Sequence, residues 1–190
     1  MMSTLGYALL GLLARDSMSG YDLAQCMKKQ VGFFWEARHS QIYTELSKLE
    51  EKGFLTYQTV QQEEKPTKKI YTITKEGKEY LLQWITEPME VPSIRDELVL
   101  KAYSLWAAKE EEEAIALFRD HEKKHLERLE HYKQILIWIE EMWNREDSRP
   151  DSQFFGSYLA IKRGIGYEEE YAKWCSWVVE QLKSKSQMKF

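Results

Sequence analysis

The order of short helical and strand patterns near the start of this 190-residue chain narrows its possible folds more than any other feature. Apolar residues recur at helical spacing in three segments: residues 5–14, a segment from a Ser19 cap to Gly32, and one from a Ser40 cap to Gly53. Two segments rich in Thr, Tyr, Val and Ile follow, Phe54–Gln62 and Lys69–Thr74, and they predict a hairpin. Three helices and a hairpin form a winged helix-turn-helix, whose third helix enters the major groove of DNA.

The predicted third helix has one face suited to contact with bases and phosphates. Ile42, Leu46 and Leu49 place its apolar side inward. The opposite face carries short polar side chains and one cation: Ser40, Gln41, Thr44, Ser47 and Lys48, with Tyr43 on the flank. These groups can contact base edges and phosphates, although an ordinary solvated helix face has the same composition.

The turn of the predicted hairpin is basic. Residues 65–75 contain four lysines and no acidic residue, a local charge of +4 (Lys65, Lys68, Lys69 and Lys75). A wing that lies along a phosphate backbone needs this bias, because each phosphate contact is made by a cation. A solvated charged turn is the alternative, but the basic turn and the polar helix together favour DNA binding.

Five ordered motifs resemble the PadR family of bacterial transcriptional regulators. They are Leu5–Leu13 (LGYALLGLL), Ser19–Leu23 (SGYDL), Gln41–Leu46 (QIYTEL), Leu49–Leu55 (LEEKGFL) and Tyr71–Gly77 (YTITKEG). The second half, with Asp96–Tyr103 (DELVLKAY) and a helical tail, is similar to the larger subfamily with a virulence-activator-type C-terminal domain. The run from Phe34 to Tyr43 is similar to the phenolic-acid-responsive repressors.

The resemblance implies a homodimer, joined through its C-terminal helices, that binds a pseudo-palindromic operator and usually represses transcription. Small aromatic effectors often release such repressors, and we expect no cofactor. The family's DNA contacts come from the start of the third helix, the wing and the start of the second helix. In this chain they correspond to His39, Ser40, Gln41, Tyr43, Thr44, Lys48, Lys65, Lys68, Lys69, Ser19 and Tyr21.

Pro88 and Pro92 mark a predicted domain boundary at about residue 90. We therefore expect a mainly α protein with a small β wing: residues 1–90 form the winged DNA-binding domain and residues 91–190 a helical dimerisation and effector domain. The second domain should hold helices over Asp96–Trp106, from Glu110 to about Trp143, and from about Phe154, where Gly164 and Gly166 leave a break open.

Tyr103 and Trp106 are the candidate effector contacts. They follow the boundary at which the two domains should meet, and aromatic side chains line pockets for planar ligands. Plain core or interface packing is the alternative for any one of these aromatic residues.

The sequence His121-Glu122-Lys123-Lys124-His125 matches the HExxH signature of zinc metalloproteases. The extended signature needs Gly where this chain has Arg128, because glycine lets the chain turn and bring a third histidine back. In a continuous helix His131 would lie about 9 Å beyond His125, too far for one zinc ion. We therefore predict no metal site and no enzyme, and we expect His125 to make a buried polar or pH-sensitive contact. The alternatives are a small zinc hydrolase and a helical protein that binds another protein.

The chain carries 27 basic and 31 acidic residues, so its net charge of −4 does not by itself point to nucleic acid. No apolar run approaches the roughly 20 residues that span a bilayer, and no basic signal-peptide region opens the chain. We therefore expect a cytoplasmic protein. The acidic remainder should limit non-specific binding and leave the basic wing to act at a matched operator.

Overall fold

The computed structural model describes residues 2–32, 35–61, 67–93, 95–108, 110–145, 149 and 151–187. The chain divides into two compact units, Met1–Glu90 and Val91–Phe190. The structure is mainly helical with one small antiparallel sheet, which confirms the predicted fold class. Within the described ranges, no helix has both the length and the apolar character that crossing a bilayer requires.

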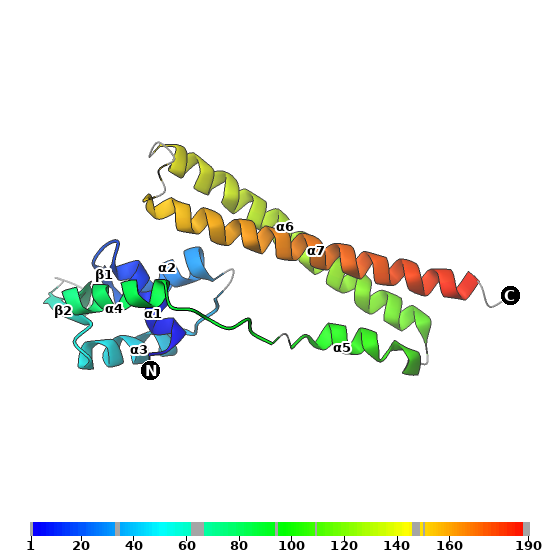
Figure 1. The fold of residues 1–190 in the computed structure, drawn as a ribbon, viewed down its shortest axis with the longest axis horizontal. Helices are drawn as coiled ribbons and strands as arrows, with labels where there is room; N and C mark the ends of the chain where they lie inside the picture. The colour runs from blue at the N-terminus through cyan, green and yellow to red at the C-terminus, as the bar shows by residue number, and fades with distance from the viewer. Residues whose placement is uncertain are drawn as a thin grey trace. The chain divides into compact units, whose positions relative to one another are not determined.

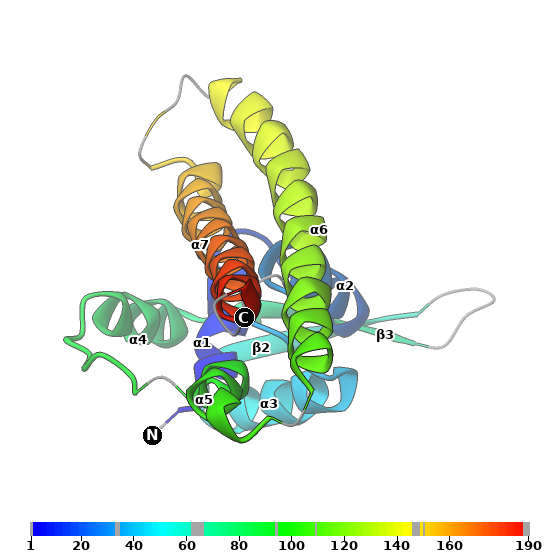
Figure 2. The same cartoon turned by 90° about the vertical axis from the view of Figure 1, so that its right-hand side faces the viewer.

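The first unit combines short helices with a sheet of strand order β1-β3-β2 (Figure 1). Its elements are α1 (Thr4–Leu13), β1 (Met18–Ser19), α2 (Gly20–Cys26), a π-helical turn (Met27–Val31), α3 (His39–Glu51), β2 (Leu55–Val60), β3 (Lys68–Ile73) and α4 (Lys75–Ile85). The central strand, β3, pairs antiparallel with both neighbours, so Tyr71 lies opposite Met18 and Tyr57. We call β2 and β3 the wing; Figure 2 shows them side by side as a ribbon.

Side-chain caps fix the helix starts in this unit. Ser3 accepts a hydrogen bond from the Gly6 N–H (3.1 Å), and Ser19 accepts one from the Asp22 N–H (3.1 Å). Gly53 ends α3 with a positive φ of 73°, a conformation that favours glycine. The Ser19 cap and the Gly53 stop lie where the sequence predicted them.

One local prediction in this unit is wrong, and one short strand was missed. Helix α3 begins at His39 with Arg38 as its N-cap, two residues earlier than the predicted Ser40 cap. The cause is Gln41, whose Oε1 accepts a hydrogen bond from the Arg38 N–H (2.9 Å) and so fixes the first turn. Strand β1 was not predicted, because two residues are too few to show an alternating pattern.

The core of the first unit lies between α1 and α3. Leu9 and Leu10 of α1 and Leu49 of α3 are fully buried, and Ile42 and Leu46 are nearly so. Burying each such side chain contributes roughly 1.5–3 kcal/mol. The inward face predicted for the third helix is therefore confirmed, and its other face is left for solvent or a partner.

The second unit is a pair of long helices with a short helix beside them. Its elements are α5 (Glu97–Tyr103), a 3-10 turn (Leu105–Ala107), α6 (Glu111–Asn144) and α7 (Gln153–Gln187). The predicted helix over Asp96–Trp106 is shorter than expected, because Asp96 is its N-cap and Ser104 separates α5 from the 3-10 turn. Helix α7 continues through Gly164 and Gly166 without a break. Figure 1 shows α6 and α7 packed side by side along their lengths.

The seam between α6 and α7 contains a polar contact at the predicted position. Phe118, Leu129 and Ile139 are buried along the seam, and so is His125. His125 Nδ1 contacts the buried carboxylate of Glu168, and its ring stacks on Tyr171 with centroids 4.1 Å apart.

Candidate nucleic-acid interface

The exposed face of α3 carries the polar residues that the sequence placed there. His39, Ser40, Gln41, Tyr43, Thr44 and Lys48 are all exposed. Thr44 Oγ1 donates to the Ser40 carbonyl (3.0 Å), so this hydroxyl has its oxygen lone pairs left for a further partner. The Gln41 carboxamide accepts from Arg38 through its oxygen, which leaves the amide N–H groups as donors. This exposed face of α3 can therefore both accept and donate hydrogen bonds.

A buried carboxylate on α3 was not predicted. Glu45 is only 6% exposed, and its Oε2 lies 3.6 Å from Lys48 Nζ. Its Oε1 would be 2.9 Å from a Cβ at position 6, so Gly6 in the first turn of α1 leaves room for it. A carboxylate beside the start of a helix interacts favourably with the helix dipole. Glu45 therefore joins α3 to α1, and the sequence offered no signal for this beyond an acid on an otherwise apolar face.

The start of α2 exposes one of its two predicted contact residues. Tyr21 is 62% exposed, whereas Ser19 is 3% exposed. The Ser19 hydroxyl donates to Asp22 Oδ2 (2.6 Å) while it accepts from the Asp22 N–H. The Ser19 side chain is thus engaged as a helix cap, and Tyr21 is the exposed member of the pair.

The lysines of the wing lie beside α2 and β2. Lys68 Nζ donates to Asp22 Oδ2 (3.2 Å), and Lys69 Nζ lies 3.7 Å from the centroid of the Tyr57 ring. The hydrogen bond from Ser19 is the main reason that the pKa of Asp22 is lowered; burial opposes this, and Lys68 adds to it. The contact with Tyr57 raises the pKa of Lys69, so this ammonium stays charged at neutral pH. Lys65 lies outside the described residues.

The starts of α2 and α3 are packed directly on each other. A Cβ at Gly20 would lie 2.6 Å from Cε1 of Tyr43, so the tyrosine ring occupies the space that a side chain would need. The ring of His39 lies 4.8 Å from the ring of Tyr43. Together with the contact between Lys68 and Asp22, this packing joins α2, α3 and β3 into one continuous surface.

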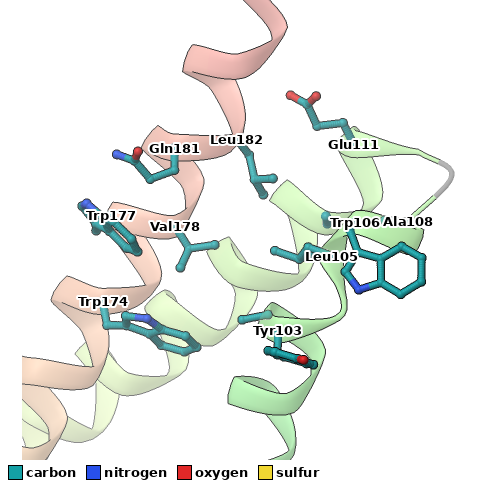
Figure 3. A pocket seen from close by; sticks show the side chains of 12 residues that line it. Tyr103, Leu105, Trp106, Ala108, Glu111, Trp174, Trp177, Val178, Gln181 and Leu182 are labelled. Atoms are coloured by element: carbon teal, nitrogen blue, oxygen red, sulfur yellow. The ribbon is translucent and has the colours of Figure 1, made fainter.

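The second unit holds an aromatic pocket of about 590 Å³ (Figure 3). Helix α5, the 3-10 turn, the start of α6 and the end of α7 line it, with Trp174 and Trp177 on α7. Tyr103 and Trp106 lie on its rim and are 81% and 86% exposed. Glu111 is the only charged side chain among its described lining residues.

The HExxH residues are not arranged as a metal site. Helix α6 runs unbroken past Arg128 to Asn144, so the chain does not bring His131 back toward His125. The His125 ring is engaged with Glu168. Among the residues that the structure describes, no group of three His, Cys, Asp or Glu side chains is placed to hold a metal ion.

Comparison with known proteins matches each of the two units to a family profile. Residues 9–83 match the profile of the Transcriptional regulator PadR-like family, and residues 94–183 match that of the Virulence activator alpha C-term domain. The negative transcriptional regulator PadR of Bacillus subtilis is 37% identical over 186 residues, which are 95% of this chain and 98% of the relative. The chain belongs to the PadR family. The resemblance noted in the sequence is therefore confirmed.

Solved structures of the same PadR protein share the fold. The crystal structure of Bacillus subtilis PadR in complex with operator DNA matches with a TM-score of 0.81 at 34% identity, over 95% of this chain and 99% of that one. Its complex with p-coumaric acid matches with a TM-score of 0.71 at 33% identity and the same coverage. Members of the PadR family are transcriptional regulators and not enzymes, so the zinc hydrolase alternative has no support.

Proposed function

We propose that this chain is a homodimeric, ligand-responsive transcriptional repressor that binds a pseudo-palindromic operator and is released by a small aromatic effector. The observation that carries the proposal is the continuous surface formed by the polar face of α3, the start of α2 and the lysines of β3. The match to a PadR structure that contains operator DNA supports the same reading.

Within this proposal the contact residues divide by chemistry. Residues on the exposed face of α3 contact base edges and adjacent phosphates: His39, Ser40, Gln41, Tyr43, Thr44 and Lys48. Lys68 and Lys69 of the wing bind phosphate, as do Tyr21 and Lys65, which precedes β3 in the sequence. Ser19 acts by capping the helix that presents Tyr21. Phosphate contacts fix the position on the duplex, and base contacts select its sequence.

The helical unit, residues 91–190, forms the dimer in this proposal. Large apolar side chains on α5 and the end of α7 are exposed: Val99 (48%), Leu100 (63%) and Trp177 (55%). Such a surface marks an interaction site, and a second copy of the chain would cover it symmetrically. Sedimentation equilibrium should give twice the chain mass of 22.7 kDa, and a monomer at micromolar concentration would contradict this part of the proposal.

An aromatic effector would act by shifting the dimer between two arrangements. One arrangement would match the spacing of the operator half-sites, and the effector would favour the other. Tyr103 and Trp106 on the rim of the aromatic pocket are the proposed contacts. If Trp106→Ala leaves both effector affinity and release from DNA unchanged, this assignment is wrong.

A gel-shift experiment tests the proposed function. The full chain should retard the DNA upstream of its own gene or of a neighbouring gene, binding should weaken as salt is raised, and p-coumarate should release the DNA. Failure to bind any of these promoters would favour the alternative in which the winged unit binds a protein. DNA binding that does not weaken as salt is raised would contradict the proposed phosphate contacts.

A further inference from the structure

The two neighbouring lysines of the wing project from opposite faces of its sheet. Successive residues of a strand alternate between the faces, so Lys68 and Lys69 of β3 cannot share one. Tyr71 follows two positions after Lys69 and lies on the same face, and Tyr57 of β2 lies directly opposite Tyr71. Lys69 therefore shares its face with two tyrosine rings, and Lys68 does not.

The two lysines also differ in the charge of their partners. Lys68 Nζ lies 3.2 Å from Oδ2 of Asp22, which partly neutralises it. Lys69 Nζ lies 3.7 Å from the centroid of the Tyr57 ring, and among the residues that the structure describes it forms no ion pair. The face of an aromatic ring attracts a cation through its quadrupole, although the ring carries no net charge. Tyr57 therefore orders the Lys69 ammonium without neutralising it.

The Tyr57 ring is itself held in place. It is half-buried and packs edge-on against Tyr71, with ring centroids 5.8 Å apart and ring planes at 61°. Edge-to-face contact is a favoured geometry for two aromatic rings. Tyr71 is only 6% exposed and belongs to the core of the first unit. The core thus fixes Tyr71, Tyr71 fixes Tyr57, and Tyr57 provides a fixed surface for the lysine.

This face of the wing lies toward α3. Burial is the main reason that the pKa of Tyr71 is raised, and electrostatic interaction with Glu50 and Tyr43 of α3 raises it further. Glu50 also raises the pKa of Lys69, by less than the contact with Tyr57 does. Tyr43 is exposed on the helix that carries the proposed base contacts. Lys69 therefore projects from the side of the wing that is nearer to this helix.

We propose that Tyr57 is a further determinant of DNA binding, a positioning residue that holds the Lys69 ammonium ready for a phosphate of the backbone beside α3. This role of Tyr57 rests on the proposed binding of operator DNA. A lysine side chain loses rotamer freedom when it binds a phosphate, and Lys69 has already lost much of it on the Tyr57 ring. Lys68, on the opposite face, binds a separate phosphate.

Fluorescence anisotropy of the full chain with the operator and with a scrambled duplex, each over a series of salt concentrations, tests this role. Tyr57→Ile removes the ring and introduces a residue that favours strands. It should weaken binding to both duplexes roughly tenfold, about threefold for each of two wings, because Lys69 must then be ordered on binding. The slope of log K against log salt concentration should stay that of the wild type, because Lys69 still neutralises its phosphate. Tyr57→Phe keeps the ring face and should retain most of the affinity.

Double variants separate positioning from a general loss of structure. Lys69→Met should make the salt slope less negative by about 1.8, which is about 0.9 for each of two wings. Adding Tyr57→Ile to Lys69→Met should then cost no further affinity, because the ring no longer has a cation to hold. The matched control is Lys68→Ala, at the neighbouring position on the other face: adding Tyr57→Ile to it should cost the same roughly tenfold as in the wild type.

Nuclear magnetic resonance of the DNA-free protein gives a second readout. The Tyr57 ring current should shift the Cε protons of Lys69 upfield in the wild type and in Tyr57→Phe, and the shift should disappear in Tyr57→Ile. The wild-type measurement needs no variant, so the role stays testable if Tyr57→Ile does not fold, which circular dichroism checks.

Three results would overturn the role of Tyr57: unshifted Lys69 Cε protons in the wild type, equal affinity of the wild type and Tyr57→Ile for DNA, or an equal loss from Tyr57→Ile in the wild-type and Lys69→Met backgrounds. Each of these leaves DNA binding by the wild type intact. Failure of the wild type to bind any duplex in the gel shift would instead refute the proposed function, and the role of Tyr57 with it.

Discussion

Replacing Lys68 by alanine should weaken binding to all DNA sequences and reduce its dependence on salt. Each phosphate neutralised by a lysine contributes about −0.9 to the slope of log K against log salt concentration. A homodimer has two wings, so Lys68→Ala should make the slope less negative by about 1.8. Between about 50 and 200 mM salt, this difference changes the ratio of wild-type to variant affinity about tenfold.

The contact with Asp22 modifies this expectation. The Lys68 and Asp22 side chains are 37% and 48% exposed, so their ion pair contributes less than about 1 kcal/mol to folding. Lys68→Ala therefore leaves the protein folded, but it leaves Asp22 facing the phosphates without its cation. Asp22→Asn should have the opposite effect and strengthen binding to all sequences, because it removes a negative charge next to DNA.

Fluorescence anisotropy with the operator and with a scrambled duplex, each over a series of salt concentrations, measures both effects. The double variant Lys68→Ala with Asp22→Asn should recover part of the affinity lost in Lys68→Ala. An unchanged salt slope for Lys68→Ala, or a loss confined to certain operator variants, would refute the assignment of Lys68 to phosphate.

Four further changes test other parts of the structure. Gln41→Ala should alter base preference across operator variants with little change in the salt slope, and a uniform loss would contradict a role in base recognition. Phe118→Ala empties a fully buried position and should lower the free energy of unfolding in urea by about 3–5 kcal/mol. Tyr171→Phe removes the hydrogen bond to Asp96 (2.7 Å) and should cost about 1 kcal/mol, whereas Tyr167→Phe, at a 42% exposed position, should cost little. Burial alone would raise the pKa of Asp96, but the hydrogen bonds from Tyr171 and the backbone outweigh it and lower that pKa. The stability that ionised Asp96 provides is therefore present above its unfolded pKa of about 3.9 and is lost as the pH falls through the lower folded pKa. Urea unfolding over a series of acidic pH values measures this effect. As the pH falls, the free energy of unfolding should decrease less in Asp96→Asn than in the wild-type protein.

The parts of the fold that local chemistry determines could be predicted from the sequence. Ser19 and Thr74 cap their helices because a hydroxyl followed by free backbone N–H groups is a local arrangement. The polar face of α3 followed from helical period alone. The buried polar contact expected for His125 was also found, because a buried polar group needs a partner.

The features that were missed depend on residues far apart in the chain or on competition between neighbours. Glu168 lies 43 positions after His125, and no local pattern links the two. The pairing of Asp22 with Lys68 spans 46 positions, and no local pattern links these two residues either. The N-cap of α3 is Arg38 and not the predicted Ser40, because the Gln41 side chain accepts a hydrogen bond from the Arg38 N–H and fixes the first turn there. The continuity of α7 through two glycines reflects its packing against α6, which outweighs their low helix propensity.

The packing of Tyr43 on Gly20 has a consequence for how related sequences can diverge. A side chain at position 20 and a tyrosine at position 43 would occupy the same space, so neither position can be exchanged freely on its own. Among descendants of a common ancestor, a larger residue at position 20 should appear only together with a smaller one at position 43. These two sites, 23 positions apart, are thus expected to evolve as a pair, and a lineage that breaks the pair would have to rebuild the angle between α2 and α3.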